Sequence, residues 1–223
     1  MLPSSATLSR RLRQPDLRSL LRELEHRLRD ANPACVCKWI DGMPLPVGGA
    51  SGDRHARNGY GAGKIARGYK LHAIGDGSRH WVTWCVLPLN HSEKLVARHL
   101  IRHCREEGYL VGDGEYDCNP LFDLAGRQGM QLIARQRSGA SLGHRRHSDY
   151  RLRCRCLLAK PIGRDLLHRR FGIDRLFGQL GNYGSGLGPL PHWVRGLSRV
   201  RRWVQAKIIL DQVRYLQKQR LTA

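Results

Sequence analysis

The order of strand-like and helix-like segments most constrains what this chain of 223 residues can fold into. Alternating or β-branched apolar residues predict five strands, at residues 36–41, 69–74, 80–87, 109–112 and 131–134. The first three strands come before any long connecting helix, and the Gly-Asp-Gly turn at 75–77 predicts a hairpin. Helical segments separate the last strands, which predicts parallel pairing. We therefore expect an α/β fold with a mixed five-stranded sheet flanked by helices.

Helical periodicity is clear between and beyond the strands. Apolar side chains at three- and four-residue spacing predict helices over residues 5–30, with a break at Pro15, and over 119–127, 164–180 and 196–219. The run Asn90-His91-Ser92-Glu93 resembles a capping box, which predicts a further helix start. The Gly-rich segment 48–64 lacks the spacing of a phosphate-binding loop, so we expect a flexible turn region there.

Three aspartates are placed where they could meet. Asp41 ends the first predicted strand, Asp113 follows the fourth, and Asp174 lies in the helix predicted over 164–180. Strand ends and a helix can bring carboxylates to one sheet edge, and carboxylates are the ligands that Mg²⁺ prefers. Two such ions are suited to phosphodiester chemistry. The alternative for Asp174 is a surface ion pair with Arg170 or Arg175. Other acids compete with these three: Glu106, Glu107, Glu115, Asp117 (which could cap the next helix) and Asp123.

The charge of the chain indicates a polyanionic partner. There are 39 Lys and Arg against 18 Asp and Glu, a formal net charge of +21. Such self-repulsion is relieved by a polyanion, and nucleic acid binds basic proteins through phosphate neutralisation. A basic surface that serves only solubility is the alternative. Apolar runs are far shorter than a membrane span and residues 1–13 do not resemble a secretory signal, so we expect a cytoplasmic, nucleoid-associated protein that does not enter a membrane.

Basic residues concentrate in one segment. Residues 135–170 hold eleven Arg or Lys and two Asp, which favours a basic loop facing DNA; a solvated charged face is the alternative. The residues predicted to contact DNA are Lys64, Lys70, Arg135, Arg137, Arg145, Arg146 and Arg170.

The cysteines and histidines do not predict a zinc site. The seven cysteines include two Cys-x-Cys pairs, at 35/37 and 154/156, but zinc sites usually have two intervening residues and a second half-site. His91, His99 and His103 lack a third ligand at a suitable spacing. We expect reduced thiols.

These segments together resemble bacterial insertion-sequence transposases of the DDE type. The resemblance rests on IDGMPLPV (40–47), GYKLH (68–72), LVGDGEYD (110–117), FGIDRLFG (171–178) and GLSRV (196–200), and it covers about residues 33–216. It implies a ribonuclease H-like fold with a basic insertion before the last catalytic helix. It also implies two Mg²⁺ or Mn²⁺ ions held by Asp41, Asp113 and Asp174. The implied partners are double-stranded DNA, at transposon ends and target, and further copies of the chain during synapsis.

The chain departs from the family pattern at three places. The third acid is usually Glu where this chain has Asp174, and Leu167 and Gly181 replace a Tyr and a Lys. Residues 1–32 are expected to be a helical stub of the DNA-binding region of a truncated reading frame, and 33–220 the catalytic domain. The resemblance thus implies DNA cleavage and strand transfer, with activity impaired by Asp174. The alternatives are a non-catalytic, DNA-binding remnant and a nuclease on the same fold.

Overall fold

The computed structural model describes residues 3–11, 13–31, 35–49, 51–61, 63–137, 147–182, 186–187 and 190–222. Within these ranges one sheet contains β1 (Cys37–Pro46), β2 (Arg57–Gly61), β3 (Lys64–Asp76), β4 (Trp81–Pro88), β5 (Gly108–Val111) and β6 (Met130–Ile133). The helices are α1 (Ser5–Arg11), α2 (Pro15–Asp30), α3 (Glu93–His103), the short 3-10 helix η1 (Gly114–Tyr116), α4 (Asn119–Arg127), α5 (Asp149–Leu158), α6 (Pro161–His168), α7 (Phe171–Asn182) and α8 (Leu197–Thr222).

The sheet has the predicted mixed topology. Its strands lie in the order β4-β3-β1-β5-β6, and β2 pairs with the first part of β3. Strands β1, β3 and β4 are antiparallel neighbours, whereas β5 and β6 run parallel to β1. This arrangement confirms the α/β fold and is compatible with a ribonuclease H-like fold.

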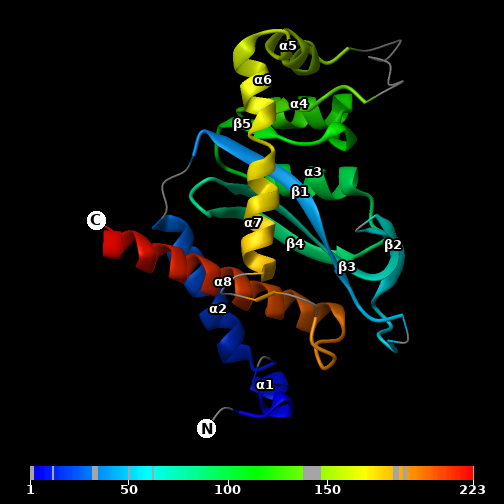
Figure 1. Ribbon diagram of the computed structural model, residues 1–223, viewed down its shortest axis with the longest axis vertical. Helices are drawn as coiled ribbons and strands as arrows, with labels where there is room; N and C mark the ends of the chain where they lie inside the picture. The colour runs from blue at the N-terminus through cyan, green and yellow to red at the C-terminus, as the bar shows by residue number, and fades with distance from the viewer. Residues whose placement is uncertain are drawn as a thin grey trace.

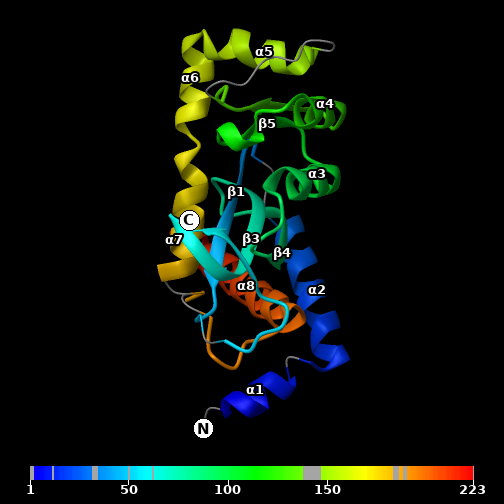
Figure 2. The same ribbon diagram turned by 90° about the vertical axis from the view of Figure 1, so that its right-hand side faces the viewer.

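Helices cover both faces of the sheet. Figure 2 shows α7 on one side of the sheet and α3 and α4 on the other. The α3 and α4 side packs around Ile40, Ile74 and Leu110, while the α7 and α8 side packs around Leu45 and Leu71. Alternate residues of β1 and β3 therefore contribute to two separate cores, as expected of strands buried on both faces.

Two sequence predictions about local structure are wrong. The segment 48–64 is not only a turn region, because its second half forms β2 and pairs with β3 despite three glycines in or next to that strand. The helix predicted over 164–180 is two helices, α6 and α7, separated at Arg169 and Arg170. The apolar periodicity continues across this break, so the sequence pattern did not reveal it.

The N-terminal helix α2 packs on the sheet domain. It contacts α8, and Figure 1 shows the two helices crossing. The carboxylate of Glu25 accepts hydrogen bonds from the Trp84 indole N–H (2.8 Å) and the Gln205 amide (2.7 Å). Residues 1–32 as a separate DNA-binding stub stay a prediction, and α2 itself contributes packing to the fold.

Helix α7 packs closely against Trp39 of β1 at Gly172. A Cβ atom at this position would overlap the indole ring of Trp39, whereas a Cβ at Gly178 would meet no atom within 4 Å. We expect Gly172→Ala to destabilise the protein by about 1–3 kcal/mol through overpacking. Gly178→Ala, the matched control on the same helix, should be neutral or stabilising by up to about 1 kcal/mol, since Ala is the better helix former. Urea denaturation measures both free energies of unfolding, and equal values for the two variants would contradict this account of the contact.

Candidate active site

The parallel strands β1 and β5 separate directly before two aspartates. Their last paired residues are Trp39 and Val111, and Asp41 and Asp113 each lie two positions further along. Asp41 is not at the end of a strand as predicted, because β1 continues to Pro46 through its pairing with β3. The proline-containing half of β1 is tolerated because β5 no longer pairs with it there. Both carboxylates therefore stand where the two strands part.

Asp41 has the more strongly perturbed carboxyl group. Burial raises its pKa to about 6, and the negative charges of Asp113, Glu93 and Asp174 act in the same direction. The backbone N–H of Gly42, which donates to Asp41 Oδ1 at 2.7 Å, opposes the rise. Among the described residues, the charges that act most strongly on Asp41 are therefore those of other acids.

Asp113 is half-buried and begins η1. Its Oδ1 accepts the backbone N–H of Glu115 at 2.9 Å, which fixes the side chain as an N-cap. Burial raises its pKa and Glu93 adds to the rise, whereas the Glu115 N–H and the guanidinium of Arg170 lower it. Glycine is needed at position 112, because a Cβ atom there would lie only 2.7 Å from the Tyr116 ring. The lack of a side chain at Gly112 therefore lets the chain before Asp113 pack against Tyr116 and against Ile40 of β1.

Asp174 lies on α7 and is exposed. Its charge contributes to the raised pKa of Asp41, but less than Asp113 or Glu93 does. Among the described residues, the three aspartates do not form a group whose ligand atoms all lie within 4.8 Å of one another. The structure therefore brings Asp41 and Asp113 into one electrostatic cluster and leaves Asp174 at its edge.

Glu93 is the acid that sequence reasoning missed. The capping-box prediction is wrong, because α3 begins at Glu93 with Ser92 as its N-cap and without a side-chain capping bond. The Glu93 carboxylate instead pairs with the ammonium group of Lys70 at 2.5 Å and raises the pKa values of Asp41 and Asp113. The only signal in the sequence was Lys70, a charged residue inside a strand that needs a buried partner.

A basic cavity opens beside Asp113. Its volume is about 490 Å³, and it is lined by Gly112, Asp113, Gly114, Arg135, Arg164, Leu167, His168, Arg170 and Phe171. Guanidinium groups are well suited to phosphate oxygens. The cavity therefore places anion-binding side chains next to the acids.

The residues predicted to bind DNA lie in different surroundings. Arg135 and Arg170 line the basic cavity, Lys64 is exposed at the start of β3, and Arg137 pairs with Glu115 at 3.3 Å. Lys70 is buried against Glu93. Arg145 and Arg146 lie outside the described residues. The basic loop predicted over 135–170 is wrong for its second part, where α5 and α6 are helices.

The raised pKa of Asp41 predicts how stability depends on pH. Its folded-state pKa of about 6 lies above the unfolded value near 3.9, so the folded state binds more protons between them. Stability from this group is present at low pH and is lost as the pH rises through about 6. We expect a loss of about 2 kcal/mol between pH 4.5 and 7.5 in metal-free protein.

Urea denaturation across this pH range, with a chelator present, measures the effect. Asp41→Asn should flatten the pH profile and be more stable than the unsubstituted protein at pH 7.5. Parallel profiles for the two proteins would contradict the predicted burial of this charge. The exposed Asp16 on α2 provides the control, since Asp16→Asn should leave the slope unchanged.

The fold and the carboxylates at the parting strands define an α/β protein with a candidate metal-binding edge. Comparison with protein families matches residues 36–188 to the transposase DDE domain. The chain belongs to this family, which confirms the resemblance seen in the sequence. Members of the family act on DNA and generally use divalent metal ions. No curated protein and no solved structure gave a significant match.

The donor set at this edge fits a hard divalent cation. Asp41 and Asp113 offer only carboxylate oxygens, and burial together with neighbouring acids raises both pKa values. A bound cation would remove this repulsion, and Mg²⁺ or Mn²⁺ suits oxygen ligands. None of the described helices has the length and apolar character needed to cross a membrane.

Proposed function

We propose that this chain catalyses metal-dependent DNA cleavage and strand transfer at insertion-sequence ends. Asp41 and Asp113 are the central metal ligands, with Asp174 as the third aspartate and Glu93 as an added carboxylate. The observation that supports this proposal most is the pair of raised-pKa carboxylates beyond the separation of β1 and β5, beside an arginine-lined cavity.

The side chains have distinct tasks in this proposal. Two Mg²⁺ or Mn²⁺ ions would activate first a water and then a 3′-hydroxyl, and would neutralise charge on the phosphate. Asp41 must be deprotonated to bind metal, so metal affinity should rise as the pH passes about 6. Arg135 and Arg170 hold the DNA phosphate next to Asp113. Tyr116 stays protonated, because burial and the nearby acids raise its pKa well above the usual value.

Double-stranded DNA is the proposed partner, both as transposon ends and as target. The arginines of the basic cavity supply sequence-independent phosphate contacts, whose number sets the salt dependence of binding. Lys64, Arg145 and Arg146 stay predicted DNA contacts. Self-association on DNA is part of the same proposal, since the two ends of an element are joined in a single reaction.

The direct test is a cleavage and joining assay. The purified chain is incubated in Mg²⁺ or Mn²⁺ with labelled duplexes carrying the terminal repeats of its element and with a target plasmid. We expect nicking at the repeat ends and covalent joining to the plasmid, both lost with a chelator. Nicking without joining would favour a nuclease on the same fold, and no cleavage with either metal would overturn the catalytic proposal.

An impaired, DNA-binding remnant is the second candidate function. It is favoured by the exposed position of Asp174 and its small influence on Asp41. In that case Asp174→Glu, which extends the carboxylate by one methylene, should raise the cleavage rate by roughly 100-fold. A catalytic group that is misplaced by about 1 Å costs a factor of this size, and the longer side chain would correct it. Asp165→Glu on α6 is the matched control and should have no effect. A cleavage rate that is already high and falls with Asp174→Glu would reject the remnant.

A further inference from the structure

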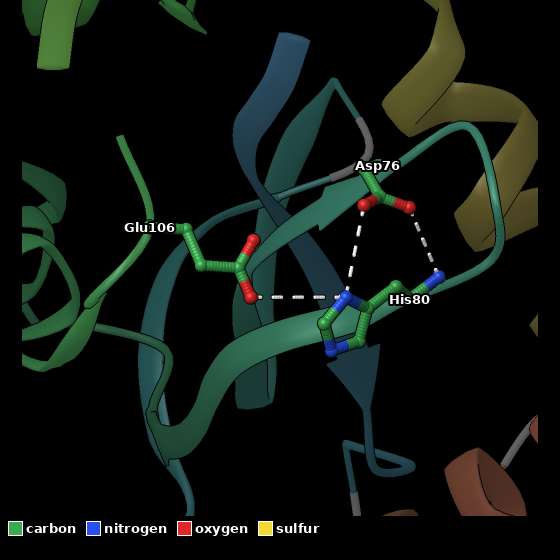
Figure 3. Close-up of side chains that lie close together, drawn as sticks. All are labelled: Asp76, His80 and Glu106. Atoms are coloured by element: carbon green, nitrogen blue, oxygen red, sulfur yellow. Dashed lines mark hydrogen bonds and ion pairs between the residues drawn. The ribbon is translucent and has the colours of Figure 1, made fainter. Parts of the chain in front are cut away.

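A second group of metal-binding side chains lies away from the candidate active site. Asp76 ends β3, His80 precedes β4, and Glu106 lies between α3 and β5. One ligand atom from each of the three side chains lies within 4.8 Å of the other two. Figure 3 shows both carboxylates directed at the same nitrogen of the His80 ring. In the described part of the chain this is the one such group of three.

The separations are too long for hydrogen bonds. His80 Nδ1 lies 3.7 Å from Asp76 Oδ2 and 3.9 Å from Glu106 Oε1, beyond the usual N–H···O range. The His80 side chain is only 1% exposed. Neither of its ring nitrogens, nor Glu106 Oε2, hydrogen-bonds to any residue that the structure describes. Buried polar groups are nearly always satisfied, so the unpartnered His80 Nδ1, at which both carboxylates are directed, indicates a missing partner.

The Asp76 carboxylate is already oriented for such a partner. Its Oδ1 accepts the backbone N–H groups of Ser78 (2.9 Å) and His80 (3.2 Å), and its Oδ2 accepts that of Cys35 (3.2 Å). Burial raises the pKa of Asp76, whereas the backbone N–H groups of Cys35 and Ser78 lower it. These backbone donors hold the carboxylate in place beside His80.

We propose that Asp76, His80 and Glu106 bind one zinc-class divalent transition-metal ion. Two carboxylates and one neutral imidazole offer a charge of −2 and a mixed oxygen and nitrogen donor set, which suits Zn²⁺ better than Mg²⁺. Tetrahedral ligands at ordinary Zn–N and Zn–O lengths stand roughly 3.3–3.6 Å apart. The separations of 3.7 and 3.9 Å from His80 Nδ1 exceed this by a few tenths of an ångström, and the two carboxylates lie within 4.8 Å of each other. Glu106 is 19% exposed, so water can reach the fourth position.

The position of the group indicates a structural role. Asp76 pairs with Lys38 near the start of β1, whereas Asp41 lies three residues further along that strand. The ion would join the β3–β4 turn to the segment before β5, at the end of the parallel strands opposite to Asp41 and Asp113. This inference is independent of the proposed function, and its test does not use DNA cleavage.

Metal analysis of the full chain tests the proposal. Protein purified without chelator is measured for zinc, then stripped, and the stripped protein is titrated with Zn²⁺ alone by calorimetry and thermal melting. We expect one ion per chain and a rise in Tm of roughly 5–10 °C at free Zn²⁺ about 100-fold above Kd. Stripped protein that neither binds Zn²⁺ nor gains stability would overturn the proposal.

Variants assign the ion to this group. Glu106→Gln, which removes a partly exposed carboxylate, and His80→Gln should each weaken Zn²⁺ binding by at least roughly 100-fold, more than the loss of an outer-shell partner. Glu107→Gln is the matched control and should bind normally, because this neighbouring side chain is exposed and outside the group. Because Asp41 and Asp113 could also take Zn²⁺, the Asp41→Asn/Asp113→Asn double variant must retain the ion. Loss of zinc in that double variant, with retention in Glu106→Gln, would overturn the assignment.

Discussion

Asp113→Asn is expected to reduce DNA cleavage by at least about a thousandfold while the protein stays folded. The substitution removes a proposed metal ligand, and a bound metal ion stabilises the charge of the transition state by several kcal/mol. Each loss of about 1.4 kcal/mol of this stabilisation slows cleavage tenfold. Asn has nearly the same shape and can still accept the Glu115 N–H at the start of η1. The raised pKa of Asp113 means that its charge opposes folding, so the free energy of unfolding at pH 7 should not fall.

The measurement pairs the cleavage rate in Mg²⁺ with urea denaturation of the same sample. Asp16→Asn on α2 is the control for a lost acid, and it should change neither quantity. If Asp113→Asn is inactive and also strongly destabilised, misfolding would explain the lost activity. Asp41→Asn then repeats the test at the other proposed ligand. Cleavage at the unsubstituted rate in both variants would remove these aspartates from the proposed mechanism.

Much of the fold could be predicted because local pattern and final structure agree. The strand at 109–112, the helix at 119–127 and the order of the sheet elements all carry clear periodicity, and the structure confirms them. Strand β2 was missed because its glycines give no side-chain pattern. They are needed because the strand passes close to its neighbours, and a Cβ at Gly59 would overlap the backbone carbonyl group of Leu89.

The candidate site was only partly predictable from the sequence. Asp41 and Asp113 come at the ends of predicted strands. Neighbouring parallel strands end at the same edge of a sheet, so the sequence alone predicts that the two aspartates lie near each other. Glu93 could not be recognised, because its role depends on the pairing with Lys70 across 23 residues and on where α3 begins. The roles of the basic residues in 135–170 were equally hidden. Charge alone does not show that Arg151 turns inward while Arg164 and Arg170 line a cavity.

Asp117→Asn is expected to have the largest effect on stability, although this acid lies only four residues from Asp113. Its carboxylate is buried and accepts two hydrogen bonds from Arg151, at 2.7 Å from Nε and 2.6 Å from Nη2. The same guanidinium donates to Asn119 Oδ1 at 3.0 Å, so α5 is held against the start of α4. Loss of one partner leaves a buried charge unpaired, which should cost about 3–5 kcal/mol. For a chain of this size the Tm should fall by roughly 6–20 °C.

Thermal and urea denaturation of Asp117→Asn check this expectation, and the exposed Asp165–Arg169 pair on α6 supplies the matched control. Asp165→Asn removes a carboxylate at a similar ion-pair distance, but in solvent it should cost no more than about 1 kcal/mol. The double variant Asp117→Leu/Arg151→Met should recover part of the loss, since apolar residues can replace a buried ion pair at little cost. Equal destabilisation by Asp117→Asn and Asp165→Asn would mean that burial of the Arg151 pair does not hold α5 in place. The two acids are thus expected to differ: replacement of Asp113 should leave the fold intact, whereas replacement of Asp117 should destabilise it.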